Sequence, residues 1–264
     1  MRILVLGDVV GRPGRGAIRE LVPSLITSES VDLAMANAEN VSGGMGVDVK
    51  SAEELFSGGI HVLTSGNHIW KKKEIFPYME EHPRLLRPAN YPPGAPGRGW
   101  FEWEGPGGLR VLVINLEGRV FMRSLEDPFR CVDAILEKHR QYSPVVLVDM
   151  HAEATSEKIA MGWYLNGRVS LVYGTHTHVQ TADERILPGG TAYITDLGMC
   201  GPLDSVIGVE KELVIEGFLS QRPLRFEVAQ DDVVLQGILL DVDEDSGKAK
   251  NIRRIRVPWK RRGG

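Results

Sequence analysis

Short apolar runs and amphipathic segments alternate along the first two-thirds of the chain. Apolar runs bounded by turn residues are typical of buried strands, and apolar positions that recur every three or four residues are typical of helices. The predicted strands span residues 3–6, 31–36, 60–64, 111–115, 145–148 and 169–173, and the predicted helices span residues 16–26, 48–56 and 130–139. Strands interleaved with helices predict an α/β fold with substantial parallel pairing.

The pattern changes after residue 191, where the helical periodicity fades. Further strands are predicted at residues 192–195, 224–228, 233–240 and 252–257, and the Pro- and Gly-rich stretch 92–108 predicts a long excursion or hairpin. The sequence has no internal repeat, low-complexity tract or linker. We therefore expect a single domain over residues 1–264.

Composition and charge narrow the class of protein. The 264 residues are 42% hydrophobic and 25% charged, which is ordinary for a globular protein with a sizeable core. The net charge of -4 gives no global attraction to nucleic acid or membrane. Two cysteines permit one disulfide but no disulfide framework. The sequence contains neither a signal peptide nor a run of roughly 20 apolar residues, so we expect a cytoplasmic protein without a membrane partner.

Polar side chains with metal-ligand chemistry follow five of the predicted strands. Ligands collect at the carboxyl ends of strands in open α/β sheets, so these side chains are expected on one rim. They are Asp8, Glu39, Asn40, Asn67, His68, His151, His176 and His178. Each one alone is more simply read as a cap, a turn residue or a satisfied histidine. Their coincidence at five strand ends, and the His-x-His pair whose imidazoles would point the same way on extended backbone, favour a metal site.

The proposed ligand set also fits a two-metal centre. Asp8 and Glu39 carry two negative charges, so two divalent ions would leave the centre net positive by about two, which favours a phosphate ester. A carboxylate can bridge two ions. Mixed imidazole and oxygen ligands suit iron, manganese or zinc better than calcium or magnesium.

Two other signals receive a simpler interpretation. The glycine-rich stretch 7–16 is not a Walker loop, because Ala17 and Ile18 stand where Lys and Ser or Thr are needed. The stretch 248–262 is basic and could contact RNA, but an edge strand protected by charge is the favoured interpretation. Its basic residues are Lys248, Lys250, Arg253, Arg254, Arg256, Lys260, Arg261 and Arg262.

The motif series resembles that of the calcineurin-like metallophosphoesterases, and more closely that of the bacterial YmdB-like branch. The likeness spans nearly the whole chain. Its motifs are Gly7-Asp8, Asn37-Ala38-Glu39-Asn40, Gly66-Asn67-His68, Arg87-Pro88-Ala89-Asn90-Tyr91, Asp149-Met150-His151, Gly174-Thr175-His176-Thr177-His178 and Thr195-Asp196-Leu197-Gly198-Met199. The resemblance implies a sandwich of two central β-sheets flanked by α-helices and hydrolysis of 2',3'-cyclic nucleotides or other phosphodiesters.

Two departures from the broad superfamily support the YmdB-like branch. Val10 stands where a histidine is usual, and Glu39 stands where a bridging Asp is usual. The resemblance implies that Asp8, Glu39, Asn40 and His178 hold one metal and that Glu39, Asn67, His151 and His176 hold the other. It implies that His68 is not a ligand but the general acid that protonates the leaving group.

The leading hypothesis is therefore a metal-dependent phosphodiesterase with two transition-metal ions per chain, iron or manganese ahead of zinc. A metal-bridging hydroxide would attack phosphorus in line while His68 protonates the departing oxygen. The expected substrate is a phosphodiester or cyclic nucleotide, including RNA-derived ones, and homo-oligomer formation is left open. The alternative is a regulatory nucleotide- or RNA-binding protein whose phosphohydrolase activity is weak or secondary.

Overall fold

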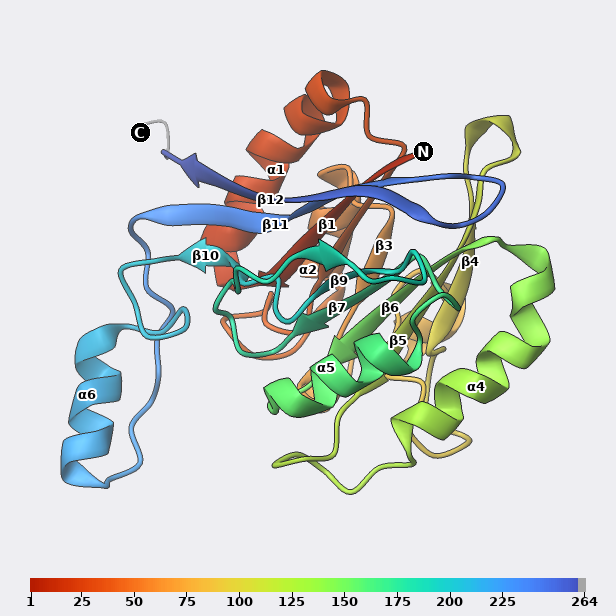
Figure 1. Cartoon of the computed structure of the whole chain (residues 1–264). Helices are drawn as coiled ribbons and strands as arrows, with labels where there is room; N and C mark the ends of the chain where they lie inside the picture. Colours follow the sequence, from red (N-terminus) through yellow and green to blue (C-terminus); the bar gives the residue numbers. More distant parts are fainter. Residues whose placement is uncertain (261–264) are drawn as a thin grey trace.

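Two β-sheets stack face to face and α-helices cover their outer faces in the computed structural model, which describes residues 1–260 (Figure 1). This arrangement confirms the predicted α/β sandwich. The helices are α1 (Gly11–Glu29), α2 (Val49–Ser57), α3 (Ile75–Glu81), α4 (Pro128–His139), α5 (Thr155–Tyr164) and α6 (Lys211–Ser220). Short 3-10 turns occur at Ile69–Lys71, Pro106–Gly108 and Arg140–Tyr142.

The first sheet has the strand order β12-β11-β10-β1-β2-β3. Its strands are β1 (Arg2–Val9), β2 (Leu33–Asn37), β3 (Val62–Thr64), β10 (Met199–Pro202), β11 (Val233–Val242) and β12 (Ala249–Trp259). β1, β2 and β3 run parallel, whereas β11 and β12 form an antiparallel ribbon at one edge. The carboxyl ends of β1, β2 and β3 therefore lie side by side.

The second sheet has the strand order β4-β5-β6-β7-β9-β8. Its strands are β4 (Trp100–Glu104), β5 (Arg110–Glu117), β6 (Val145–His151), β7 (Leu171–Thr175), β8 (Arg185–Ile186) and β9 (Ala192–Ile194). β5, β6, β7 and β9 are parallel, and the two edge strands are antiparallel to their neighbours. The carboxyl ends of β6 and β7 thus share one end of this sheet.

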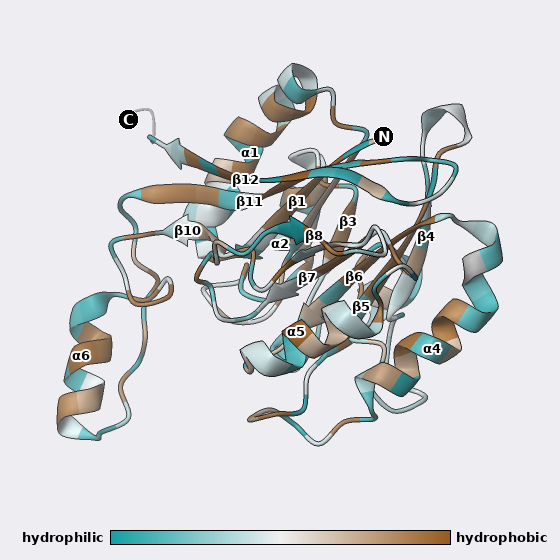
Figure 2. Cartoon of the chain, in the orientation of Figure 1, coloured by the Kyte–Doolittle hydropathy of each residue, from teal (hydrophilic) through white to brown (hydrophobic). Residues whose placement is uncertain are grey.

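The central strands consist mainly of hydrophobic residues, coloured brown in Figure 2, and apolar side chains of both sheets pack together in one buried cluster. Alternate residues of a strand face opposite sides, so Ile3 and Val5 pack against the second sheet while Leu4 and Leu6 pack under the helices. A third cluster joins α4 and α5 to the outer face of the second sheet. The central strands β2, β6 and β7 are buried on both faces, which explains why they are apolar almost without interruption.

The structure corrects two expectations about the C-terminal third. Residues 224–228 are not a strand and form only an isolated bridge between Val209 and Val228. Helix α6, which precedes them, was not predicted, because its apolar residues do not gather on one face that packs in the core: Phe218 is 74% and Leu219 82% exposed. The segment forms a lobe that projects from the sheets (Figure 1).

The basic stretch 248–262 behaves largely as expected. Its described part forms the edge strand β12, and three of its side chains are in ion pairs with acidic residues. Arg261 and Arg262 lie outside the described residues. Cys131 and Cys200 are both free, so the disulfide that the sequence permits is not formed.

No helix within residues 1–260 has the length and apolar character that crossing a membrane requires.

Candidate metal centre

The carboxyl ends of five strands from the two sheets face one another. Sequence reasoning placed the polar side chains on one rim, but β1, β2 and β3 belong to the first sheet and β6 and β7 to the second. The two sheet ends together form the site. Every predicted site residue contacts at least one other there: Asp8, Glu39, Asn40, Asn67, His68, His151, His176 and His178.

Asp8 reaches the site through an irregularity in β1. The register against β2 shifts between Leu6 and Asp8, and such bulges commonly re-aim a side chain. Gly7 occupies the irregular position, where an added Cβ would lie only 1.9 Å from the carbonyl oxygen of Gly198. The close approach of that backbone therefore requires glycine before the aspartate. The Asp8 carboxylate accepts a hydrogen bond from the His176 backbone N–H at 3.1 Å.

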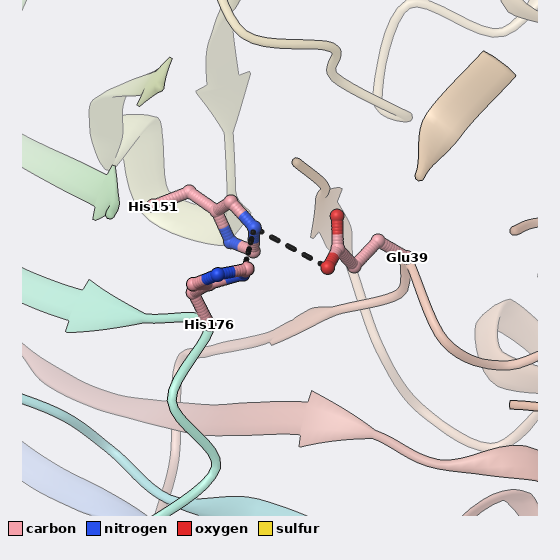
Figure 3. Close-up of side chains that lie close together, drawn as sticks. All are labelled: Glu39, His151 and His176. Carbon is pink, nitrogen blue, oxygen red and sulfur yellow. Dashed lines mark hydrogen bonds and ion pairs between the residues drawn. The ribbon is translucent and has the colours of Figure 1, made fainter. Parts of the chain in front are cut away.

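Three side chains converge on Nε2 of His151. Asn67 Oδ1 and His176 Nδ1 each lie 3.1 Å from it, and Glu39 Oε1 lies at 3.2 Å. Glu39, His151 and His176 form a group that could hold a metal ion (Figure 3). Together with Asn67 they are the four residues expected to hold one metal. The four contribute two imidazole nitrogens and two oxygens.

The second expected group contains buried oxygens that have no hydrogen-bond partner. Asp8 Oδ1 lies 3.8 Å from His178 Nε2, and neither it nor Asn40 Oδ1 nor Glu39 Oε1 has a hydrogen-bond partner within residues 1–260. All three oxygens are buried. A buried acceptor without a partner costs about 1–3 kcal/mol. A cation would satisfy all three oxygens at once.

Each candidate histidine ligand has its other ring nitrogen against an acceptor. Nδ1 of His178 lies 2.8 Å from the Ile207 carbonyl oxygen, and Nε2 of His176 lies 3.1 Å from Glu153. Nδ1 of His151 lies 2.9 Å from the Thr175 hydroxyl, which donates to Asp149. Such partners hold the proton on the outer nitrogen and direct the other lone pair at a metal.

His68 has a different environment from these three. Its backbone N–H donates to Glu39 Oε2 at 3.0 Å, and its Nδ1 lies 3.3 Å from Glu39 Oε1. Its side chain is 22% exposed, whereas that of His151 is fully buried. Nδ1 faces the carboxylate, so Nε2 is the atom left to interact with a bound molecule.

The charges of the site favour a cation. Burial opposes ionisation of Glu39, but His151 and His68 hold the pKa of its carboxyl well below the usual value. Burial likewise opposes charge on His151, yet Glu39 and Asp8 raise the pKa of its imidazole to about 9. Burial and the neighbouring His151 lower the pKa of His176 to about 3. The carboxylates thus draw one positive charge into the cluster, and a metal ion would supply it in place of that proton.

The His-x-His segment does not follow the expected extended path. β7 ends at Thr175, and His176 (φ 98°) and His178 (φ 63°) both have positive φ. The two imidazoles therefore have different neighbours: that of His176 contacts His151, and that of His178 lies near Asp8. The residue between them, Thr177, donates its hydroxyl to Asp196 at 2.7 Å.

Asp196 forms a buried ion pair beneath this segment. Its carboxylate lies 2.7 Å from Nζ of Lys158, and both side chains are at most 1% exposed. The same carboxylate accepts the Thr177 backbone N–H at 3.3 Å. The pair therefore holds the left-handed segment that carries His176 and His178.

Sequence reasoning missed the residues that support the cluster. Asn37 accepts the Glu39 backbone N–H at 3.1 Å, and Asp149 accepts hydrogen bonds from the hydroxyls of Thr64 and Thr175. The i and i+2 spacing of Asp149 and His151 on one strand was the available signal. Asn37 and Glu39 have the same spacing, whereas Thr64 and Thr175 gave no such signal because their partner Asp149 is distant in sequence.

A cavity of about 880 Å³ opens on the site. Its polar end is lined by Glu39, Asn40, His68, His176 and His178. The other end is lined by residues of the segment 206–228. Its size is that of a small-molecule site.

A two-sheet α/β sandwich with carboxylate, amide and imidazole groups at facing strand ends has the architecture of metallophosphoesterases. The chain belongs to the YmdB-like family, whose model, described as YmdB-like protein, matches residues 4–255. The resemblance inferred from the motifs is thereby confirmed.

Relatives with known names or structures cover nearly the whole chain. The chain is 47% identical over 257 residues to the 2',3'-cyclic-nucleotide 2'-phosphodiesterase of Bacillus subtilis, covering 97% of each protein. A novel phosphatase from Mycoplasma pneumoniae superposes with a TM-score of 0.92 at 34% identity, covering 98% of this chain and 93% of that one. A hypothetical protein from Thermus thermophilus has the same TM-score at 41% identity, covering 98% and 99%.

Proposed function

We propose that this protein is a metal-dependent phosphodiesterase with two transition-metal ions per chain and that 2',3'-cyclic nucleotides are its substrates. The carrying observation is the convergence of buried, unpartnered oxygens of Asp8, Glu39 and Asn40 with imidazole nitrogens at one place. The name of the Bacillus subtilis relative supports the substrate. We further propose that residues 1–264 act as one domain.

The donor set fits two metal ions that share Glu39. Glu39, Asn67, His151 and His176 would hold one ion, and Asp8, Glu39, Asn40 and His178 the other. Mixed nitrogen and oxygen donors place iron or manganese ahead of zinc. Bound there, the ions would stabilise charge on the phosphoryl oxygens and lower the pKa of a water to make it nucleophilic.

His68 would complete the reaction as the general acid. Glu39 accepts the His68 backbone N–H and faces its Nδ1, which holds the ring in the lining of the cavity. Nε2 can then donate a proton to the ribose oxygen as it leaves phosphorus. His68 follows Asn67, and adjacent residues rarely reach one ion with good geometry, so we assign it no metal.

The alternative of a regulatory RNA-binding protein has less support. Lys250, Arg253 and Arg254 of the basic edge strand are paired with Asp243, Glu29 and Glu184. Pairing reduces the charge available for phosphates. The alternative predicts salt-sensitive RNA affinity that survives metal removal.

Metal analysis and a substrate panel test the proposal. We expect gently purified protein to contain about two transition-metal ions per chain and to hydrolyse 2',3'-cyclic nucleotides faster than linear diesters or monoesters. Activity should disappear with a chelator and return when iron or manganese is restored. Full activity in metal-free protein would refute the metal dependence, and no turnover of any diester by metal-loaded protein would refute the phosphodiesterase function.

A further inference from the structure

The cavity at the candidate metal centre has two chemically distinct ends. The lining that comes from segment 206–228 is mainly apolar, with Gln221 and Arg222 as its polar members, and it includes two aromatic side chains, Phe218 and Phe226. Both are largely exposed, at 74% and 55%. Aromatic residues so accessible beside a catalytic centre need an explanation, because they are not needed for the core.

The apolar end is fixed to the metal centre by backbone contacts. The Ile207 carbonyl oxygen accepts from His178 Nδ1 at 2.8 Å, so this segment also orients a candidate ligand. Gly208 accepts the Ala229 N–H at 3.1 Å, and Glu227 accepts the Glu210 N–H at 2.9 Å, which closes the base of the lobe. These bonds hold the base of the lobe that carries Phe218 and Phe226 next to the candidate ligand His178.

We infer that Phe218 and Phe226 form a binding site for the base of the nucleotide substrate. The inference rests on the proposed function and names a specificity element of the same site. Every nucleobase has an apolar face that stacks on aromatic side chains with little dependence on its identity. A cyclic nucleotide places its charged phosphate and its flat base at opposite ends, which matches the polar and apolar ends of the cavity.

A second copy of this chain is the competing occupant of the apolar surface. Helix α6 also exposes Ile215 and Leu219, but these line a separate, shallow depression and not the cavity. Phe218 and Phe226 instead line the same cavity as His68 and His176. Continuity with the catalytic groups favours the substrate as their partner.

Phe226→Ala is the test, and Leu219→Ala on the adjoining helix is the matched control. Metal-loaded proteins are assayed on 2',3'-cyclic AMP and on a base-free five-membered cyclic diester, the cyclic phosphate of propane-1,2-diol. Loss of one stacked base is expected to lower kcat/KM for the nucleotide roughly 5- to 150-fold, mainly through KM. The base-free substrate and the Leu219→Ala variant should be unaffected, and Phe226→Leu should have an intermediate effect.

Several results would overturn the inference and leave the phosphodiesterase function intact. The first is a wild type that does not prefer the nucleotide over the base-free diester. The second is an equal loss of kcat/KM on both substrates in Phe226→Ala. The third is an equal loss in Phe226→Ala and Leu219→Ala, accompanied by a change of oligomeric state in size-exclusion chromatography. Calorimetric titration of the protein with 3'-AMP, compared with titration with inorganic phosphate, tests the base site without turnover. This comparison tests the inference even if no diester is hydrolysed. Phe218→Ala, at a more exposed position, provides the measurement if Phe226→Ala does not fold.

Discussion

Replacing His68 with alanine separates a general acid from a metal ligand. The backbone N–H of residue 68, which donates to Glu39 Oε2 at 3.0 Å, remains in the variant. Glu39 therefore keeps a bond that orients it, and only the contact from Nδ1 at 3.3 Å is lost. The side chain is 22% exposed, so its truncation should lower the free energy of unfolding by about 1 kcal/mol. We expect His68→Ala to fold and to retain both metals.

The catalytic loss should depend on the leaving group. A ribose alkoxide needs a proton as the bond to phosphorus breaks, so removal of the acid should lower kcat/KM for a 2',3'-cyclic nucleotide about 10²–10⁴-fold. That range corresponds to about 2.7–5.4 kcal/mol of transition-state stabilisation. A nitrophenolate departs without protonation, so a nitrophenyl phosphodiester should lose much less.

The assay compares kcat/KM for both substrates in wild type, His68→Ala and His82→Ala, with metal content measured in each sample. His82 stacks on Tyr78 outside the site, so its variant controls for the loss of a partly exposed imidazole. An equal loss on both substrates with metals retained would indicate phosphate positioning instead of proton donation. A loss that follows metal depletion would make His68 a ligand and refute the assignment.

Three further predictions concern metal binding, stability and thiol reactivity. Glu39→Gln should reduce occupancy of both metal sites, whereas Asn40→Ala should weaken mainly one; two metals bound to Asn40→Ala with unchanged affinity would contradict the ligand assignment. Lys158→Met leaves the Asp196 charge buried and unpaired, so urea unfolding should show a loss of about 3–5 kcal/mol, and a loss below about 1 kcal/mol would contradict this role. Burial raises the pKa of the Cys131 thiol to about 11, so about one molecule in a thousand is thiolate at pH 8. Its alkylation should therefore be slow at pH 8 and rise about tenfold per pH unit below pH 11, and an ordinary rate at pH 8 would show that the thiol is not so perturbed.

Several features of this protein follow from its sequence alone. Apolar runs interleaved with helical periodicity predicted the central parallel strands of both sheets and the α/β class, because burial on two faces demands continuous apolar residues. The short strands β8 and β10 were not predicted. Polar residues at strand ends predicted the candidate site, because parallel strands end together. The motif around Asn67 and His68 also supported the family assignment before any contact was known.

Tertiary structure decided how these pieces work together. The sequence could not show that the five strand ends belong to two facing sheets, since pairing between strands distant in the chain leaves no local pattern. It could not show the register shift before Asp8 or the left-handed backbone of His176 and His178, which depend on close packing with Gly198 and on support from Asp196.

Sequence analysis also could not identify the groups that contact the second ring nitrogen of each candidate histidine ligand. Thr175, Glu153 and the Ile207 carbonyl oxygen each face one histidine ring nitrogen, and each lies on a different segment from the histidine that it contacts. Helix α6 was missed for a related reason: its apolar residues are exposed beside a cavity and do not form a face packed in the core. Sequence periodicity reports burial in the core, so a segment whose apolar side chains serve a cavity becomes recognisable only once the fold has placed it there.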